Sequence, residues 1–344
     1  MLPSSHMDAL PEHEKAARKR AINNWCGKLR RHVATVGQTL PVGALIAVVA
    51  DNDVSDSEIE QFVADFQQRF DIAGAEAAGG PEPRIIDAGR PLRVLTLGSG
   101  DNTPIVLIHG FGSDLGSWLF NQEALGADRM VHSLDLPGHG ESDKDVGDGS
   151  VQELSSAVVA VLDSLDVSRA HLVGHSLGGA IAAQLAVQVP ARVASITLIA
   201  PAGLGPEIAG RFIDGFIQET RPRKIRAVLE MLVANPNLIT VDMVEDVLRF
   251  KRLDGAEVAL RQIAGTNFPG GTQANHLVDD LAQSAVPILA IVGEEDEIIP
   301  SRHVDALPER AEIIRLTRAG HLPHMECSAE VNEAIQIFVG AAPG

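Results

Sequence analysis

The sequence predicts an α/β protein whose mostly parallel, doubly wound sheet carries a helical cap and follows a small β-rich segment. From residue 84 onward, short apolar runs alternate with helical patterns, which is typical of a parallel sheet covered on both faces. The stretch 205–285 interrupts this alternation with apolar residues at helical spacing only. Before residue 71, apolar runs punctuated by Gly37 and Gly43 indicate short strands joined by turns.

The chain is expected to divide at a stretch that cannot build a core. Residues 71–83 consist largely of alanine, glycine, proline and acidic residues, a composition typical of a flexible linker. We therefore expect a first domain at 1–70, with strands within 27–51 and a short helix at 55–70. The second domain is expected to span 84–344.

Apolar runs in this second domain have the length and composition of buried strands. They are 93–97, 105–108, 130–134, 170–173, 195–199, 288–292 and 313–316. Between them, helices are expected at 151–165, 178–189 and 329–339. The insertion at about 205–285 is expected to form the cap and to lie over the carboxyl edge of the sheet.

Composition excludes several classes of function. The formal net charge of −18 at pH 7 repels nucleic-acid phosphates and anionic membranes. Cys26 and Cys327 are far apart and provide neither a disulfide framework nor metal-ligand spacing. The apolar run 43–50 is much shorter than the roughly 20 residues that a membrane helix requires, and the N-terminal residues do not resemble a signal peptide. We expect a cytoplasmic protein with no nucleic-acid or membrane partner and no metal.

The strongest chemical signal is a serine on a predicted strand-to-helix turn. Residues 174–178 read Gly-His-Ser-Leu-Gly, directly after an apolar strand and directly before an apolar helix. Such a sharp turn leaves little room for side chains beside the serine, which accounts for Gly174 and Gly178. The following helix directs backbone N–H groups toward developing negative charge. This context predicts that Ser176 is a nucleophile.

A serine nucleophile requires a base, and the base requires a carboxylate on its other ring nitrogen. Among twelve histidines, His321 follows the strand expected at 313–316, at the edge where doubly wound sheets bind ligands. In this fold the acid lies between the serine and the histidine in the chain, and Asp296 follows the strand 288–292. We predict His321 as the base and Asp296 as the acid, with Glu295 as second choice.

The other candidates have structural interpretations. Glu294 and Glu297 flank Asp296 and are expected to face solvent, while four histidines close to the motifs are expected to be structural: His109, His139, His175 and His324.

Two backbone donors are needed to stabilise an oxyanion. The glycine-rich turn His-Gly-Phe-Gly at 109–112 stands where the strand 105–108 ends. The N–H groups of Phe111 and Leu177 are therefore the predicted pair. The turn-rich loop 135–142 is expected to form a wall of the site without taking part in the reaction.

Five ordered motifs identify a resemblance. They are HGFG, DLPGHGES, GHSLGG, GEEDEIIP and GHLPH, and through them residues 84–344 resemble the α/β-hydrolase family. More narrowly, LIAPAGLGPEI, RFKRLDG and VGQTLPVGALIAVVADNDVSD are similar to the dihydrolipoyllysine-residue acetyltransferase (acyltransferase) component of acetoin dehydrogenase complexes. That resemblance implies transfer of an acetyl group from dihydrolipoamide to coenzyme A. It also implies a lipoyl domain at the N-terminus and partners among the components of an acetoin or 2-oxo-acid dehydrogenase complex.

The N-terminal segment departs from the lipoyl pattern. A lipoyl domain carries its modified lysine after a complete first half, whereas only fourteen residues precede the sole candidate, Lys15. We therefore expect a truncated lipoyl-like remnant in which Lys15 is an ordinary surface lysine without a lipoyl group.

Three functions stay open. The first is acyl transfer through acyl-Ser176, with lipoamide and coenzyme A as substrates and no tightly bound cofactor. The second is a hydrolase of small esters, thioesters or carbon–carbon bonds, and the third is a non-catalytic docking core of a dehydrogenase complex. A basic cluster in the insertion is a candidate for binding a coenzyme A phosphate: Arg221, Arg223, Lys224 and Arg226.

The insertion also bears on substrate size. Its apolar residues predict a small, hydrophobic pocket suited to acetyl or short branched acyl groups. These residues are Phe212, Ile213, Phe216 and Met231.

Overall fold

The computed structural model describes residues 28–34, 45–50, 54–76 and 81–342, and the chain forms two compact units, 1–80 and 81–344. In the first unit, β1 (Lys28–His32) pairs antiparallel with β2 (Ala47–Ala50). Helix α2 (Asp56–Glu76) follows them. Residues 1–27, including Lys15, lie outside the described residues.

Helix α2 is longer than the sequence indicated. At its start, Ser55 Oγ accepts a hydrogen bond from Glu58 N, and the Glu58 carboxylate accepts one from Ser55 N, which is a capping box. At its end, the helix continues beyond Phe70 to Glu76. Alanine is the strongest helix former and a single glycine costs only about 1 kcal/mol, so this alanine-rich stretch prolongs the helix. The expected division into a first domain ending at 70, a linker at 71–83 and a second domain starting at 84 stays a prediction.

The second unit contains an eight-stranded sheet in the order β10-β9-β8-β7-β5-β6-β4-β3. Neighbouring strands from β10 to β6 are parallel, whereas β4 and β3 run antiparallel at one edge. The strands are β3 (Arg84–Asp87), β4 (Pro91–Gly98), β5 (Asn102–Ile108), β6 (Arg129–Leu134), β7 (Ala170–His175), β8 (Val193–Ile199), β9 (Ile288–Gly293) and β10 (Glu312–Leu316).

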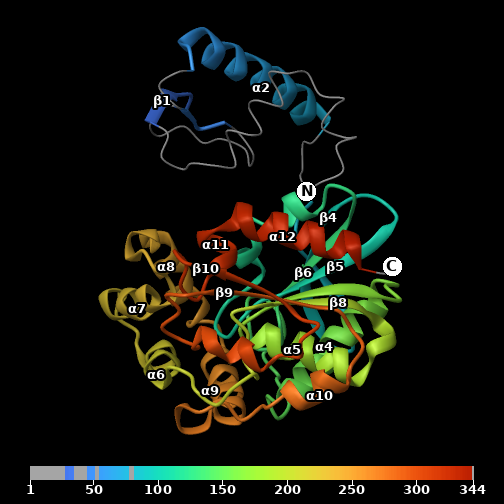
Figure 1. Cartoon of the computed structure of the whole chain (residues 1–344). Coiled ribbons are helices and arrows are strands. Elements are labelled where there is room, and N and C mark those ends of the chain that lie inside the picture. Colours follow the sequence, from blue (N-terminus) through green and yellow to red (C-terminus); the bar gives the residue numbers. More distant parts are fainter. Residues whose placement is uncertain (1–27, 35–44, 51–53, 77–80, 343–344) are drawn as a thin grey trace. The chain divides into compact units, whose positions relative to one another are not determined.

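Helices cover both faces of this sheet (Figure 1). Helices α4 (Val151–Ser164), α5 (Leu177–Gln188) and α10 (Val278–Gln283) lie on one face, and α11 (Pro323–Glu326) and α12 (Ser328–Ala341) lie on the other. The short helix α3 (Gln122–Leu125) packs against α12. Helix α5 is apolar on nearly all sides because the sheet, α4 and α10 surround it.

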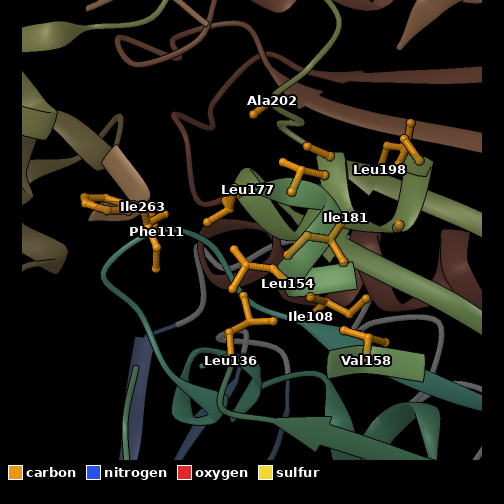
Figure 2. Packing of buried hydrophobic residues seen from close by; sticks show 14 of the residues in the cluster. Ile108, Phe111, Leu136, Leu154, Val158, Leu177, Ile181, Leu198, Ala202 and Ile263 are labelled. Carbon is orange, nitrogen blue, oxygen red and sulfur yellow. The ribbon is translucent and has the colours of Figure 1, made fainter. Parts of the chain in front are cut away.

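The core therefore has two layers. Figure 2 shows part of the larger one, in which Leu154 and Val158 of α4 and Ile181 of α5 pack with Ile108 of β5. A second cluster joins α12 to the other face of the sheet through Val331, Ile335 and Phe338.

A helical insertion forms the cap. Helices α6 (Gly210–Gln218), α7 (Pro222–Leu229), α8 (Val241–Phe250) and α9 (Ala256–Asn267) gather at one end of the sheet (Figure 1). The cap is shorter than the expected 205–285 because α10 packs against α5 in the sheet layer.

The predicted fold class is confirmed, with one strand missed. All of the predicted strands are present, and β3 is the additional one. The pattern did not reveal β3 because it is an exposed edge strand, in which Ile85 is 53% exposed. Whether the small N-terminal β piece derives from a lipoyl domain stays a prediction. Among the residues that the structure describes, no helix combines the length and apolar character needed to cross a membrane.

Candidate active site

Ser176 occupies a strained turn between β7 and α5. Its backbone has φ 52° and ψ −114°, a conformation that non-glycine residues rarely adopt. The turn is fixed by hydrogen bonds from Ser176 N to Ile199 O at 2.9 Å and from Ala202 N to Ser176 O at 3.0 Å. A Cβ at Gly174 would lie 2.1 Å from Gly178 O, so this close crossing explains the first glycine of the motif.

His321 and Asp296 meet beside this turn. The His321 Nδ1–H donates to Asp296 Oδ2 at 2.8 Å, and the two side chains are only 2% and 1% exposed. The other oxygen, Asp296 Oδ1, accepts from Ile298 N at 2.8 Å and from Ile299 N at 3.0 Å. The carboxylate is therefore held on both sides, and it orients the imidazole.

The neighbouring glutamates do not reach His321. Glu294 and Glu295 are exposed, and Glu297 forms a surface ion pair with Arg211 at 2.8 Å. Of the four acidic residues at 294–297, only Asp296 contacts His321.

His175 connects the serine turn to the histidine loop. Its Nε2–H donates to the carbonyl oxygen of His321 at 2.8 Å, and the two ring centroids lie 4.9 Å apart. Burial, followed by the neighbouring His324 and His321, lowers the pKa of His175 well below its usual value. A neutral imidazole directly before Ser176 therefore contacts the predicted base.

The glycine-rich turn after β5 lies against Ser176. A Cβ at Gly110 would be 3.1 Å from Ser176 Cβ. Leu177 is the first residue of α5, so its N–H has no acceptor within the helix. In the described part of the chain, no group accepts a hydrogen bond from Leu177 N or Phe111 N. Both residues contribute buried side chains to the packing in Figure 2.

Comparison with known proteins agrees with this geometry. The alpha/beta hydrolase family matches residues 105–334, a range that begins within β5, extends past β10 and includes Ser176, Asp296 and His321. The chain belongs to the α/β-hydrolase family.

Curated relatives carry more specific names. The dihydrolipoyllysine-residue acetyltransferase component of the acetoin cleaving system of Pseudomonas putida is 46% identical over 315 residues, 91% of this chain and 84% of the relative. The component of the same name from Cupriavidus necator is 38% identical over 91% of this chain and 84% of its own. A 2-hydroxy-6-oxononadienedioate/2-hydroxy-6-oxononatrienedioate hydrolase of Paraburkholderia phymatum is 28% identical over 78% of this chain and 98% of the relative.

Solved structures share the fold. A meta-cleavage product hydrolase from Pseudomonas fluorescens IP01 superposes with a TM-score of 0.68 at 22% identity, and the match covers 75% of this chain and 97% of the hydrolase. At this identity the likeness concerns the fold alone. Together, the family match and the names of these relatives support an enzyme.

The loop after β6 does more in this α/β-hydrolase than form a wall. His139 Nε2 accepts a hydrogen bond from Gly112 N at 3.1 Å, and His109 Nε2 accepts one from Leu136 N at 2.9 Å. Burial lowers the pKa of His109 to about 4 and, together with the charge of His109, lowers the pKa of His139 to about 3. Both rings are therefore neutral acceptors that fix the glycine-rich turn. No pattern in the sequence indicates these bonds, although the loops follow adjacent strands of the sheet.

The cap seals the site from one side. Phe216 of α6 packs against Phe111 with ring centroids 6.0 Å apart, and a Cβ at Gly112 would lie 2.4 Å from the Phe216 ring. Phe212 and Ile213 are buried beside it. Ser176 is only 6% exposed.

The basic cluster is only partly available for binding. Arg221, Arg223 and Lys224 are exposed at the start of α7, whereas Arg226 pairs with Glu230 at 2.9 Å. A surface depression of about 450 Å³ lies elsewhere, between Arg84, Asn102 and His132, and does not include Ser176. Within the described ranges, no group of three or more His, Cys, Asp or Glu side chains could hold a metal ion.

Proposed function

We propose that this protein catalyses acyl transfer through an acyl-Ser176 intermediate, with His321 as general base and Asp296 as the acid that orients it. The proposal is based mainly on the buried hydrogen bond from His321 Nδ1 to Asp296 Oδ2. This bond leaves Nε2 of the same ring free to take a proton. The strained turn at Ser176 beside this pair supports the role of the serine as nucleophile.

In the first half-reaction, Ser176 Oγ attacks the carbonyl carbon of a thioester while His321 Nε2 takes the hydroxyl proton. Asp296 stabilises the resulting imidazolium. The backbone N–H groups of Phe111 and Leu177 donate to the tetrahedral oxyanion, and the N-terminus of α5 adds its favourable dipole. Collapse of the intermediate expels the thiol, which receives the proton from His321. The acyl group then stays on Ser176 as an ester.

In the second half-reaction, the thiol of coenzyme A gives its proton to His321 and attacks the acyl-Ser176 ester. The products are an acyl-coenzyme A and the regenerated hydroxyl. The names of the relatives at 46% and 38% identity support acetyl as the acyl group and dihydrolipoamide as its carrier. No tightly bound cofactor is required for these steps. Other components of an acetoin-cleaving complex would deliver the acyl-lipoyl arm, and Lys15 is not assigned a lipoyl group.

The enclosed site favours a thiol acceptor over water. Ser176, His321 and Asp296 lie beneath an apolar cap, and exclusion of water protects an acyl ester from hydrolysis. A second candidate is hydrolysis of carbon–carbon bonds or esters by the same groups. The 28% identical hydrolase of Paraburkholderia phymatum, which aligns over 98% of its own length, favours this alternative.

The product of an acyl donor distinguishes these candidates. Purified protein is given S-acetyl-dihydrolipoamide with and without coenzyme A, and acetyl-coenzyme A and free acetate are quantified. We expect acetyl-coenzyme A as the main product, and we expect Ser176→Ala to abolish it. Release of acetate at the same rate with and without coenzyme A would identify a hydrolase instead. If neither product depends on Ser176, the proposed mechanism is wrong.

A further inference from the structure

Glu326 at the end of α11 joins the histidine loop to the cap. Its Oε1 accepts a hydrogen bond from Gly320 N at 2.8 Å, directly before His321. Its Oε2 accepts one from Ala234 N, also at 2.8 Å, in the cap segment that follows α7. One carboxylate therefore bridges two backbone segments that are far apart in the sequence.

A third hydrogen bond joins the same two segments. His321 N donates to Leu232 O at 2.8 Å, so residues 232–234 of the cap are bonded directly to His321 and, through the Glu326 carboxylate, to Gly320. The contact is also close sterically: a Cβ at Gly320 would lie 2.8 Å from Ala234 N and 2.9 Å from the carbonyl carbon of Val233. Only glycine allows the cap backbone to approach this near.

The chemistry of Glu326 suits this bridge. An ionised carboxylate is an acceptor at both oxygens, and its hydrogen bonds to N–H groups are stronger than neutral ones. Glu326 is partly buried, which raises the pKa of its carboxyl, while the N–H groups of Ala234 and Gly320 oppose that rise. A glutamine at this position would place an amide N–H₂ against one of the two N–H groups, because an amide has only one acceptor oxygen.

We propose that Glu326 is a positioning residue that makes closure of the cap and alignment of His321 a single event. While residues 232–234 are docked, the peptide of His321 is fixed and its ring meets Asp296. When this cap segment moves away, its bonds to Glu326 and His321 are lost and the base loses its alignment. This inference rests on the proposed role of His321.

Such coupling would bear directly on the choice of acyl acceptor. An open cap admits water, but in that state the base is not aligned to activate it. A closed cap aligns the base, but in that state only an acceptor that bound before closure can react. The acyl-Ser176 ester would thus survive until a thiol arrives, which deepens the proposal of transfer over hydrolysis.

The test compares Glu326→Gln with a matched control, Glu330→Gln, which changes an exposed glutamate on the neighbouring helix α12. The rate of Ser176 acylation by p-nitrophenyl acetate is measured for each, together with the downfield proton resonance of the His321–Asp296 hydrogen bond. We expect Glu326→Gln to lower the acylation rate at least tenfold and to broaden or remove the resonance. Glu326→Asp, which keeps the charge on a shorter arm, should recover part of the rate. Glu330→Gln should behave as wild type.

Wild-type acylation with an unchanged resonance in Glu326→Gln would overturn the proposal. A loss of thermal stability alone, with both readouts unchanged, would assign Glu326 a merely structural role and would also overturn it.

Hydrogen exchange on the wild-type protein gives a second measurement that does not depend on the variant folding. Peptides covering 230–236 and 317–323 should exchange with one common opening rate. Two clearly different rates would contradict the coupling. If wild-type protein is not acylated at Ser176, the proposed function fails, whereas the exchange measurement still decides whether the cap and the histidine loop move together.

Discussion

Histidines crowd the candidate active site, and most of them are held neutral. His324 lies between His175 and Trp118, with ring centroids 4.6 Å and 4.7 Å away, and both of its ring nitrogens are buried. Burial and the charge of His321 lower the pKa of His324 to about 3. The pKa of His139 is also about 3, and that of His109 is about 4. Neutral rings at these positions add no positive charge that would compete with an imidazolium at His321.

These lowered pKa values predict a loss of stability in mild acid. The unfolded chain takes up protons at these histidines near pH 6.5, whereas the folded protein does not. The free energy of unfolding is therefore highest above pH 6.5 and decreases as the pH falls toward the pKa values of these histidines in the folded protein. The decrease is up to about 1.4 kcal/mol per pH unit for each ring. In His324→Phe, the free energy of unfolding should fall less steeply with pH, by the contribution of one histidine ring. Urea unfolding between about pH 6.5 and about pH 4.5 measures this dependence.

An unaltered dependence on pH in His324→Phe would show that His324 is already protonated in the folded protein.

The residue types and their order were sufficient to predict that His321 and Asp296 meet, whereas the catalytic role of Ser176 stays a prediction. A serine between glycines after β7, and an aspartate and a histidine after β9 and β10, must converge at the carboxyl edge of a parallel sheet. Glu326 was not predictable in this way, because its role depends on a cap segment nearly a hundred residues earlier in the chain. No local pattern specifies that contact.

At the scale of elements, two loops at the ends of β5 and β6 support each other. Asp135 Oδ1 accepts from Leu115 N at 2.8 Å, in addition to the bonds that His109 and His139 accept. The turn that carries Phe111 N is thus fixed from the neighbouring loop. Sequence patterns predict where such loops begin, but their mutual bonds depend on which strands are neighbours in the sheet.

His139→Phe tests this support. The ring of His139 stacks on Phe250 and meets His109 edge-on, so phenylalanine keeps the ring packing. It removes the acceptor for Gly112 N and also the donor from His139 Nδ1 to Pro137 O. An unpaired buried N–H should destabilise the protein by about 1–3 kcal/mol. Ser176 acylation should fall about tenfold, less than the roughly 10²-fold or greater loss expected for removal of an oxyanion donor itself. A variant destabilised to this extent but acylated at the wild-type rate would show that the loop contact has no role at the site.

Element boundaries were predicted less well than element types. Helix α2 passes the expected end because a run of alanine and glycine next to proline has the composition of a linker, yet alanine favours helix. Edge strand β3 has no clear apolar face, and α10 has the same helical spacing as the cap although it packs on α5. In each case the boundary or the place of the element depends on its packing in the folded chain. The periodicity of the sequence does not contain that information.

At the scale of the whole molecule, an α/β-hydrolase domain follows a small unit whose described residues form two antiparallel strands and one long helix. The net charge of −18 is suited to partners with basic surfaces. The names of the relatives place them in an acetoin cleaving system, and we propose a similar multi-component setting for this chain. Alternation of apolar runs with helical patterns predicted the sheet, and helical spacing within 205–285 predicted the cap. The five motifs fall on strand ends that the fold brings together.

Trapping the acyl-enzyme tests most directly whether Ser176 carries the acyl group. Protein mixed with S-acetyl-dihydrolipoamide is quenched in acid, weighed intact by mass spectrometry and digested to locate the modification. We predict one acetyl group on the peptide that contains Ser176, its loss on addition of coenzyme A, and no modification of the Ser176→Ala variant. An unmodified wild-type protein that still turns over its substrate, or an acetyl group on another residue, would contradict the central claim that Ser176 carries the acyl group.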